Sequence, residues 1–297
     1  MNISEAVTSE MPKLQANGEA LAPEFVAELP FRPIVIAGAP RCGTHFLHSL
    51  ICTSEQASLF APEYHYFYFM LEAYLRSLKA FNSANSAGFR DKEEFGRHHF
   101  TLMRTTLLAM WEHLGRPGSL VMKHCSLTPF LPVLARRFEN MRFVVIQRDA
   151  RDSVASEVRA ARKRLDDPSA LPMNVIENSI ARYNMYYGAI VAAGAGLAGR
   201  LHCVSYEDLV RGHGIEAIGH FLHFSDIDPR KLWKRATFNI GDYSDFFLYS
   251  ELWGAPISAE HIGRFQETLP EEISDQIAAR TRRVSLGFEA LCSVHHA

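Results

Sequence analysis

Cysteine is scarce in this 297-residue sequence, and its spacing fits neither a disulfide framework nor a standard zinc motif. The five cysteines are odd in number, contain no CxxC pair and are scattered at positions 42, 52, 125, 203 and 292. This pattern favours reduced thiols in a cytoplasmic protein. A cluster of Cys42, His45 and His48 with His124 and Cys125 has no standard zinc spacing, so we expect no metal.

The sequence also lacks a strong net charge and a long apolar run. Its formal net charge of −2 provides no general field for nucleic acid, and no stretch is apolar enough for a membrane span or a secretory signal. Residues 1–30 are acidic, and we expect them to form a mobile N-terminal arm. A hydrophobic content of 47% suffices for a large core, so residues 31–297 are expected to form one domain.

What the sequence does contain is a series of short apolar segments that alternate with helical patterns. The apolar segments begin at Pro33 and recur at 118–123, 141–147 and 200–205; helices are expected near 62–79, 91–114, 128–138, 148–165, 172–193 and 270–286, with a polar loop over 81–90. This alternation predicts an α/β fold with a central parallel sheet. Ligands of such sheets bind at the carboxyl ends of the strands. Four suitable side chains are expected there: Arg41, Lys123, Arg148 and Tyr206.

The first apolar segment leads into a turn with two glycines, and a helix follows. Gly38 and Gly43 are spaced as in a P-loop, but Thr44 stands at the position of the P-loop lysine. Backbone N–H groups at such a turn, together with the helix dipole, favour a bound anion. Arg41 adds a guanidinium inside the turn. The sequence therefore predicts an anion site without the lysine that grips ATP.

The turn Gly-Ala-Pro-Arg-Cys-Gly-Thr-His, residues 38–45, resembles the 5′-phosphosulfate-binding loop of sulfotransferases, which is usually Pro-Arg-Ser-Gly-Thr-Thr. Two positions differ, because Cys42 replaces the serine and His45 replaces the second threonine. The resemblance implies a P-loop-like three-layer fold with a helical insertion. It also implies that the turn binds 3′-phosphoadenosine 5′-phosphosulfate (PAPS), whose desulfated product is PAP. The cofactor contacts implied for the turn are Arg41, Cys42, Gly43, Thr44 and His45.

A second segment combines an arginine at the end of a strand with a serine eight residues later. Arg148 and Ser156 lie about two helical turns apart and can converge on one phosphate. The stretch Arg-Asp-Ala-Arg-Asp from Arg148 resembles the 3′-phosphate motif of sulfotransferases, with Ala150 in place of proline. Tyr-Glu-Asp-Leu at Tyr206 and Gly-Arg-Phe at Arg264 resemble two further segments of this family. The resemblance implies that Arg148, Ser156, Tyr206 and Arg264 bind the cofactor.

The resemblance also implies catalytic roles for Glu63, Lys123 and Arg41. Lys123 ends a strand between the two phosphate motifs, as does the lysine that contacts the transferring group in this type of sulfotransferase. Glu63 follows Arg41 by 22 residues, close to the spacing of the catalytic base in the tyrosylprotein branch. We expect an aromatic pocket to raise the pKa of Glu63 and so make it a better base. Three alternative bases remain, because cytosolic sulfotransferases use histidine: His45, His65 and His124.

The expected function is in-line transfer of a sulfuryl group from PAPS to an acceptor hydroxyl, without a metal. The acceptor can be a small molecule, a sugar, a phenol or a peptide tyrosine. Segment 60–115, inserted between the turn and Lys123, is expected to cover the acceptor side. Two alternatives stay open, namely a P-loop-like nucleotide-dependent kinase and an inactive PAP-binding scaffold. The sequence does not distinguish a monomer from a homodimer.

Overall fold

The structure is a computed structural model that describes residues 28–61, 63–85, 87–163, 171–237, 254 and 256–295. Of the expected N-terminal arm, only residues 28–30 are described, and the rest of that prediction lies outside the described residues. Leu29 is buried in the core, so the described chain is already packed before the first strand begins.

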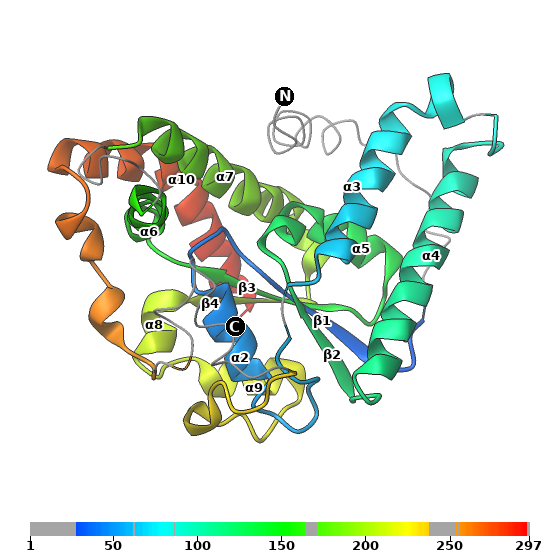
Figure 1. Ribbon diagram of the computed structural model, residues 1–297, viewed down its shortest axis with the longest axis horizontal. Coiled ribbons are helices and arrows are strands. Elements are labelled where there is room, and N and C mark those ends of the chain that lie inside the picture. The colour runs from blue at the N-terminus through cyan, green and yellow to red at the C-terminus, as the bar shows by residue number, and fades with distance from the viewer. Residues whose placement is uncertain are drawn as a thin grey trace.

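A four-stranded parallel sheet forms the centre of the described chain (Figure 1). Its strands are β1 (Arg32–Ala37), β2 (Ser119–Lys123), β3 (Arg142–Gln147) and β4 (Leu201–Ser205), in the spatial order β2-β1-β3-β4. The chain leaves β1 toward β2 on one side and continues from β3 to β4 on the other. The strand order therefore reverses between β1 and β3, which is where open sheets of this kind form a ligand crevice.

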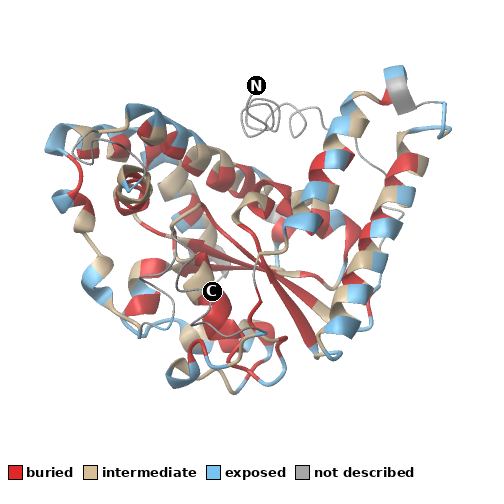
Figure 2. Ribbon diagram, viewed as in Figure 1, coloured by how far each residue is buried: buried red, intermediate tan, exposed pale blue. Residues whose placement is uncertain are grey.

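The strands are buried along nearly their whole length because helices cover both faces of the sheet (Figures 1 and 2). The covering helices are α2 (Thr44–Ile51), α5 (Leu131–Arg137), α6 (Ala150–Arg162), α7 (Met173–Ala193), α8 (Tyr206–Val210), α9 (Ile215–Leu222) and α10 (Glu271–His295). Helix α2 packs on β1 and β2, whereas α10 packs on α7 and β4. The predicted α/β architecture is confirmed. None of the described helices combines the length and the apolar composition that a bilayer span requires.

Two long helices stand to one side of the sheet as a hairpin, at the right of Figure 1. They are α3 (His65–Lys79) and α4 (Lys92–His113), and α4 begins where the Asp91 side chain accepts a hydrogen bond from the Glu94 amide at 2.7 Å. The predicted helices of this segment are present. Its expected polar loop is partly ordered into a π-helical turn, Phe81–Asn85, because Phe81 is buried against the hairpin and holds the chain close to it.

Two helices differ from the expected boundaries for identifiable reasons. The helix expected over 128–138 is preceded by a 3₁₀ turn, Cys125–Phe130, because the His124 side chain accepts the Ser126 amide at 3.2 Å and starts a turn early. Helix α10 continues past residue 286 to His295, because Phe288 is buried and packs edge-on against Tyr187, with ring centroids 5.1 Å apart.

Tyr187 and Thr128 hold the end of β1 in register with the end of β3. The Tyr187 hydroxyl donates to the Ile146 carbonyl at 2.7 Å and accepts from the Ala39 amide at 3.2 Å. The Thr128 hydroxyl accepts from the Gly38 amide at 2.9 Å. Because buried backbone groups need partners, these two side chains fix the path of the turn after β1 before any ligand arrives.

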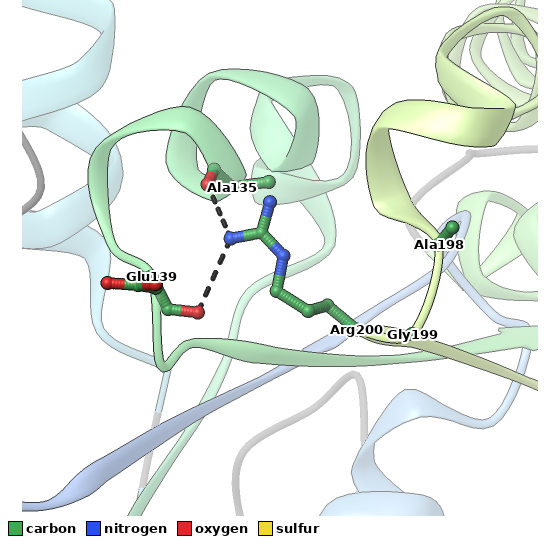
Figure 3. A pocket seen from close by; sticks show the side chains of 5 residues that line it. All are labelled: Ala135, Glu139, Ala198, Gly199 and Arg200. Carbon is green, nitrogen blue, oxygen red and sulfur yellow. Dashed lines mark hydrogen bonds between the residues drawn. The ribbon is translucent and has the colours of Figure 1, made fainter. Parts of the chain in front are cut away.

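At the opposite, amino-terminal edge of the sheet, Arg200 lines a pocket with Ala135, Glu139, Ala198 and Gly199 (Figure 3). Its guanidinium donates to the carbonyls of Ala135, Phe138 and Glu139 at 2.5, 3.3 and 3.4 Å. These carbonyls lie in the last turn of α5 and just beyond it, where helix carbonyls lose their partners within the helix. Arg200 therefore caps a helix, and we assign this pocket no ligand.

Candidate active site

The turn after β1 is a strained loop that only small residues and one arginine occupy. Gly38 and Gly43 have φ angles of 146° and 93°, and Arg41 adopts the left-handed region with φ 66°. A Cβ on Gly43 would lie 2.6 Å from the ring of Tyr206, and one on Gly38 would lie 2.5 Å from the Ile146 carbonyl oxygen. Glycine is required at both positions because the loop packs directly on its neighbours.

The loop places backbone amides at the start of α2. The first hydrogen bond along this helix runs from the Leu47 amide to the Gly43 carbonyl at 3.0 Å, so the amides before it point out of the helix end. No described side chain caps that end. The amides of Gly43, Thr44 and His45 therefore lie at a helix N-terminus, where an anion is favoured.

The loop and the second motif lie against each other across the crevice between β1 and β3. Arg41 donates from Nε to Ser156 Oγ at 3.0 Å, and Arg148 donates from Nη1 to the Arg41 carbonyl at 3.3 Å. Cys42 is fully buried, with Sγ 3.2 Å from Ser153 Oγ. Burial raises the pKa of the Cys42 thiol to about 11, so this residue packs as a neutral thiol and offers no nucleophile.

Arg148 is a buried guanidinium with 6% of its surface exposed. It lies over the Tyr206 ring, 4.4 Å from the centroid, and donates from Nη2 to the His261 carbonyl. Its Nε–H has no hydrogen-bond partner among the described residues. Asp152 lies 3.8 Å away, but its carboxylate already accepts the amides of Gly263 and Phe265 at 2.7 and 3.0 Å. A buried cation with a spare donor is the arrangement that a phosphate would complete.

Two further arginines surround Arg148, and the sequence identified only one of them. Arg264 pairs with Glu267 at 3.2 Å and lies 3.2 Å from His261 Nδ1. Arg159, which the sequence reasoning missed, donates to Thr268 Oγ1 at 2.8 Å. Burial and the charges of Arg264 and Arg148 lower the pKa of Arg159, as expected in a group of like charges. Its position three residues after Ser156, on the same helix face, could have revealed it.

Lys123, Glu63 and His45 meet beside the loop. Lys123 is the last residue of β2 and is completely buried. Its ammonium donates to Glu63 Oε1 and lies 2.8 Å from His45 Nε2. Because an ammonium has donors only, His45 Nε2 must accept this hydrogen bond. Glu63 and His45 are largely buried, with 19% and 18% of their side chains exposed. The structure thus brings the expected base and the expected lysine into direct contact.

Two more of the expected histidines join this group through Glu63. His124 Nε2 lies 3.7 Å from Glu63 Oε2, and His65 Nε2 lies 3.9 Å from the same oxygen. His124 Nε2 also lies 3.0 Å from His65 Nδ1. All of the proposed bases therefore lie in one cluster, although they come from α2, from α3 and the segment before it, and from the residue after β2.

The pKa of Glu63 corrects one expectation. Burial is the largest single effect and raises this pKa, as the sequence reasoning assumed. The charge and hydrogen bond of Lys123, together with the charges of His124 and His65, outweigh burial and lower the pKa below its usual value. The aromatic environment was foreseen, but the buried ammonium beside the carboxyl was not. Burial together with Lys123 also holds the pKa of His45 well below its usual value. Burial lowers the pKa of His124 to about 4, against the charge of Glu63. At neutral pH the carboxylate is ionised and these two imidazoles are neutral.

Glu63, His65 and His124 are also spaced as metal ligands, since one ligand atom of each lies within 4.8 Å of the others. The donor and acceptor nitrogens of His124 do not fit a metal ligand. His124 Nδ1 accepts the Ser126 amide, so neutral His124 carries its proton on Nε2, the nitrogen that a metal would need. Lys123 also places a positive charge on the same carboxylate. The group of Cys42, His45, His48, His124 and Cys125 is no alternative, because His48 packs on Phe60 and Cys42 on Ser153.

Residues 33–223, well over half of the chain, match the profile of the sulfotransferase family. The chain belongs to the sulfotransferase family. As a sulfotransferase it is an enzyme, and the resemblance noted in its two phosphate motifs is confirmed. No curated protein has a sequence that matches it closely enough to establish a relationship.

Solved sulfotransferase structures share its fold at low sequence identity. The sulfotransferase domain from the curacin biosynthetic pathway has a TM-score of 0.52 at 16% identity, covering 86% of this chain and 99% of that one. The sulfotransferase domain of the Synechococcus PCC 7002 olefin synthase has a TM-score of 0.53 at 16% identity, covering 87% and 95%. A sulfotransferase from Alicyclobacillus acidocaldarius has a TM-score of 0.50 at 12% identity, covering 89% and 97%. The P-loop-like fold of this sulfotransferase is therefore confirmed.

We expect Gly43→Ala to destabilise the sulfotransferase by about 3 kcal/mol, because it adds left-handed strain and a clash with Tyr206. Gly212→Ala is the matched control, since Gly212 has a similar φ of 85° but no heavy atom within 4 Å of its Cβ position. That control should cost only about 1 kcal/mol. Urea unfolding of both variants measures the difference, and equal losses would contradict the close packing of Tyr206 on the loop.

We expect Lys123→Met to lower the free energy of unfolding by about 3–5 kcal/mol at pH 7, because a buried carboxylate loses its partner. In the wild type the lowered pKa of Glu63 stabilises the fold above pH 4.5, and this contribution is lost as the pH falls through the folded pKa. In the variant burial would instead raise the pKa of Glu63. The penalty should therefore shrink as the pH is lowered from 7 toward 4.

Urea unfolding at both pH values measures this change. The control is the same lysine substitution in a Glu63→Gln background, where the penalty should not depend on pH. A pH-independent penalty in the single variant would show that Glu63 is not the group that Lys123 stabilises.

Proposed function

We propose that this sulfotransferase transfers the sulfuryl group of PAPS to the hydroxyl of an acceptor that Glu63 deprotonates. The observation that carries the proposal is the contact of Lys123 and Glu63 beside the anion-binding loop. It supports the proposal because a cation suited to the sulfuryl group and a carboxylate suited to the acceptor proton lie at the same edge of the sheet. In-line transfer requires the acceptor oxygen, the sulfur and the leaving phosphate oxygen to be collinear, with the base beside the acceptor oxygen.

The 3′-phosphate is proposed to bind beside Arg148 and Ser156. The unpartnered Nε–H of Arg148 supports this placement, as does the group of like charges formed by Arg148, Arg159 and Arg264. Tyr206 stacks under Arg148 and contacts the loop, so it keeps the guanidinium in place. A 3′-phosphate would neutralise this buried charge, which is the physical basis for selecting PAPS over nucleotides without that group.

The 5′-phosphosulfate is proposed to bind the loop itself. The proposed donors are the Arg41 guanidinium and the backbone amides of Gly43, Thr44 and His45. The Cys42 amide, expected from the sequence to join them, instead donates to the Ala39 carbonyl at 3.3 Å. Lys123 is proposed to reach the sulfuryl oxygens, where charge grows in the transition state. No step in this scheme needs a metal, because the side chains and amides supply the positive charge.

Glu63 is favoured as the base over the histidines of the cluster. His45 Nε2 is occupied by the Lys123 ammonium, and His124 Nδ1 is occupied by the Ser126 amide. Glu63 is ionised at neutral pH, and its Oε1 is released for the acceptor when Lys123 moves away. When Lys123 turns toward the sulfuryl group, the carboxylate loses its strongest stabilisation. Its pKa then rises, which makes it a better base at the moment of transfer.

Calorimetry with PAP and AMP tests the cofactor assignment, because the two ligands differ by the 3′-phosphate. We expect the wild type to bind PAP at least tenfold more tightly than AMP without Mg²⁺. Arg148→Ala should remove that preference, since it deletes a charge-assisted contact worth about 1.5–3 kcal/mol.

The matched control is Arg90→Ala, which removes one positive charge from an arginine whose side chain is 80% exposed. It should leave both affinities within about twofold of the wild type. A preference for Mg·ATP, or a PAP preference that survives Arg148→Ala, would contradict the proposed cofactor site.

We expect Glu63→Gln to lower kcat by roughly 10²–10⁴-fold with little change in PAP affinity, because glutamine keeps the shape but cannot accept the proton. Turnover can be measured with labelled PAPS and an acceptor found in a panel of phenols, sugars and alcohols. His45→Asn and His65→Asn are the comparison variants. Full activity of Glu63→Gln, with loss in one histidine variant, would assign the base to that histidine.

A further inference from the structure

His124 is a buried histidine whose proton position is fixed by the backbone. The Ser126 amide donates to its Nδ1 at 3.2 Å, and its ring stacks on Tyr68 with centroids 4.9 Å apart and planes 11° apart. Burial lowers its pKa to about 4, so the ring is neutral at neutral pH. A neutral imidazole has one N–H, and because Nδ1 accepts, that N–H must be on Nε2.

The fixed proton of His124 sets the proton position of His65 in turn. His124 Nε2 lies 3.0 Å from His65 Nδ1, so this nitrogen of His65 accepts. The N–H of His65 is then on Nε2, the nitrogen 3.9 Å from Glu63 Oε2. The rings of His65 and His124 meet edge to face at 4.8 Å, which restrains the orientation of this pair.

We propose that the hydrogen-bond chain from Ser126 through His124 to His65 has a fixed direction, and that its last N–H, on His65 Nε2, closes on Glu63 Oε2 when substrates bind and so positions the base for proton transfer. The proposal rests on the proposed function of Glu63. In this chain His124 and His65 are positioning residues and neither accepts the acceptor proton. Lys123 donates to Oε1 from the other side, so the two carboxylate oxygens face different groups, the ammonium at Oε1 and the His65 N–H at Oε2.

The chain matters most when Lys123 turns toward the sulfuryl group. Glu63 would then lose the contact at Oε1, and its carboxylate could rotate. A donor at Oε2 keeps the carboxylate plane fixed and leaves Oε1 to face the acceptor. The 3.9 Å separation is longer than a hydrogen bond, and such catalytic contacts often tighten only when substrates are bound. His65 is the exposed end of the chain, with 61% of its side chain accessible, so it can adjust.

The test combines leucine variants, which cannot donate, with glutamine variants, which can. We expect His65→Leu and His124→Leu each to lower kcat about tenfold, the effect of one hydrogen bond to a charged group. The KM for PAPS and the affinity for PAP should stay within about twofold, which also shows that the variants fold. His65→Gln and His124→Gln should recover much of the lost kcat, because each retains an N–H donor.

A double-mutant cycle distinguishes a connected hydrogen-bond chain from two histidines that affect the site independently. The double leucine variant should be no worse than either single variant, because removing one link already breaks the chain. In a Glu63→Gln background neither leucine substitution should lower kcat further. Additive losses, a changed PAP affinity, or glutamine variants as poor as leucine would overturn the proposal.

A second readout does not depend on turnover. The carboxyl carbon of Glu63 can be titrated by NMR in the wild type and the leucine variants. Loss of the donor at Oε2 should raise the pKa of Glu63 equally in both single variants and no further in the double variant. Unchanged titration would overturn the chain. If Glu63→Gln kept full activity while this pattern held, the chain would stand and only the proposed base would fail.

Discussion

The buried guanidinium of Arg148 connects the parts of the site that are far apart in the sequence. It donates to the Arg41 carbonyl in the loop after β1 and to the His261 carbonyl near the C-terminus, and it lies on the ring of Tyr206 after β4. Asp152 offsets part of its charge while anchoring residues 263–265. A cation held so far from water needs an anion, and the fold leaves one of its donors unpartnered.

Lys123 is also a buried cation, but unlike Arg148 it has a carboxylate, that of Glu63, directly beside it. Here a cation and an anion are buried together, and each reduces the cost of burying the other. Burial raises the pKa of Glu63, but the charge and hydrogen bond of Lys123, with the neighbouring histidines, together lower it. The resting site is therefore stable but holds a weak base. Any ligand that draws Lys123 away from the carboxylate would strengthen that base, which couples donor binding to proton removal in the proposed mechanism.

The two departures from the usual loop sequence have different physical consequences. Cys42 replaces a hydroxyl with a thiol that is buried against Ser153, so it fills space and adds no charge. His45 replaces a threonine with an imidazole that accepts from Lys123, and it therefore helps to place the lysine. The first change leaves the chemistry of the loop alone, whereas the second extends the loop's contacts to the catalytic group.

The sequence alone determined the parallel sheet, the loop with its two glycines, and the positions of Arg41, Lys123, Arg148 and Tyr206 at strand ends, because these follow from local periodicity and backbone geometry. It also supplied all the members of the base cluster. Only the tertiary structure decided the pKa of Glu63, the position of Arg159 in the group of arginines with Arg148 and Arg264, and the direction of the histidine hydrogen bonds. Glu63 and Lys123 are 60 residues apart, so their contact depends on how α3 and β2 pack. Charge and proton position are set by neighbours in space, and no local pattern in the chain records them.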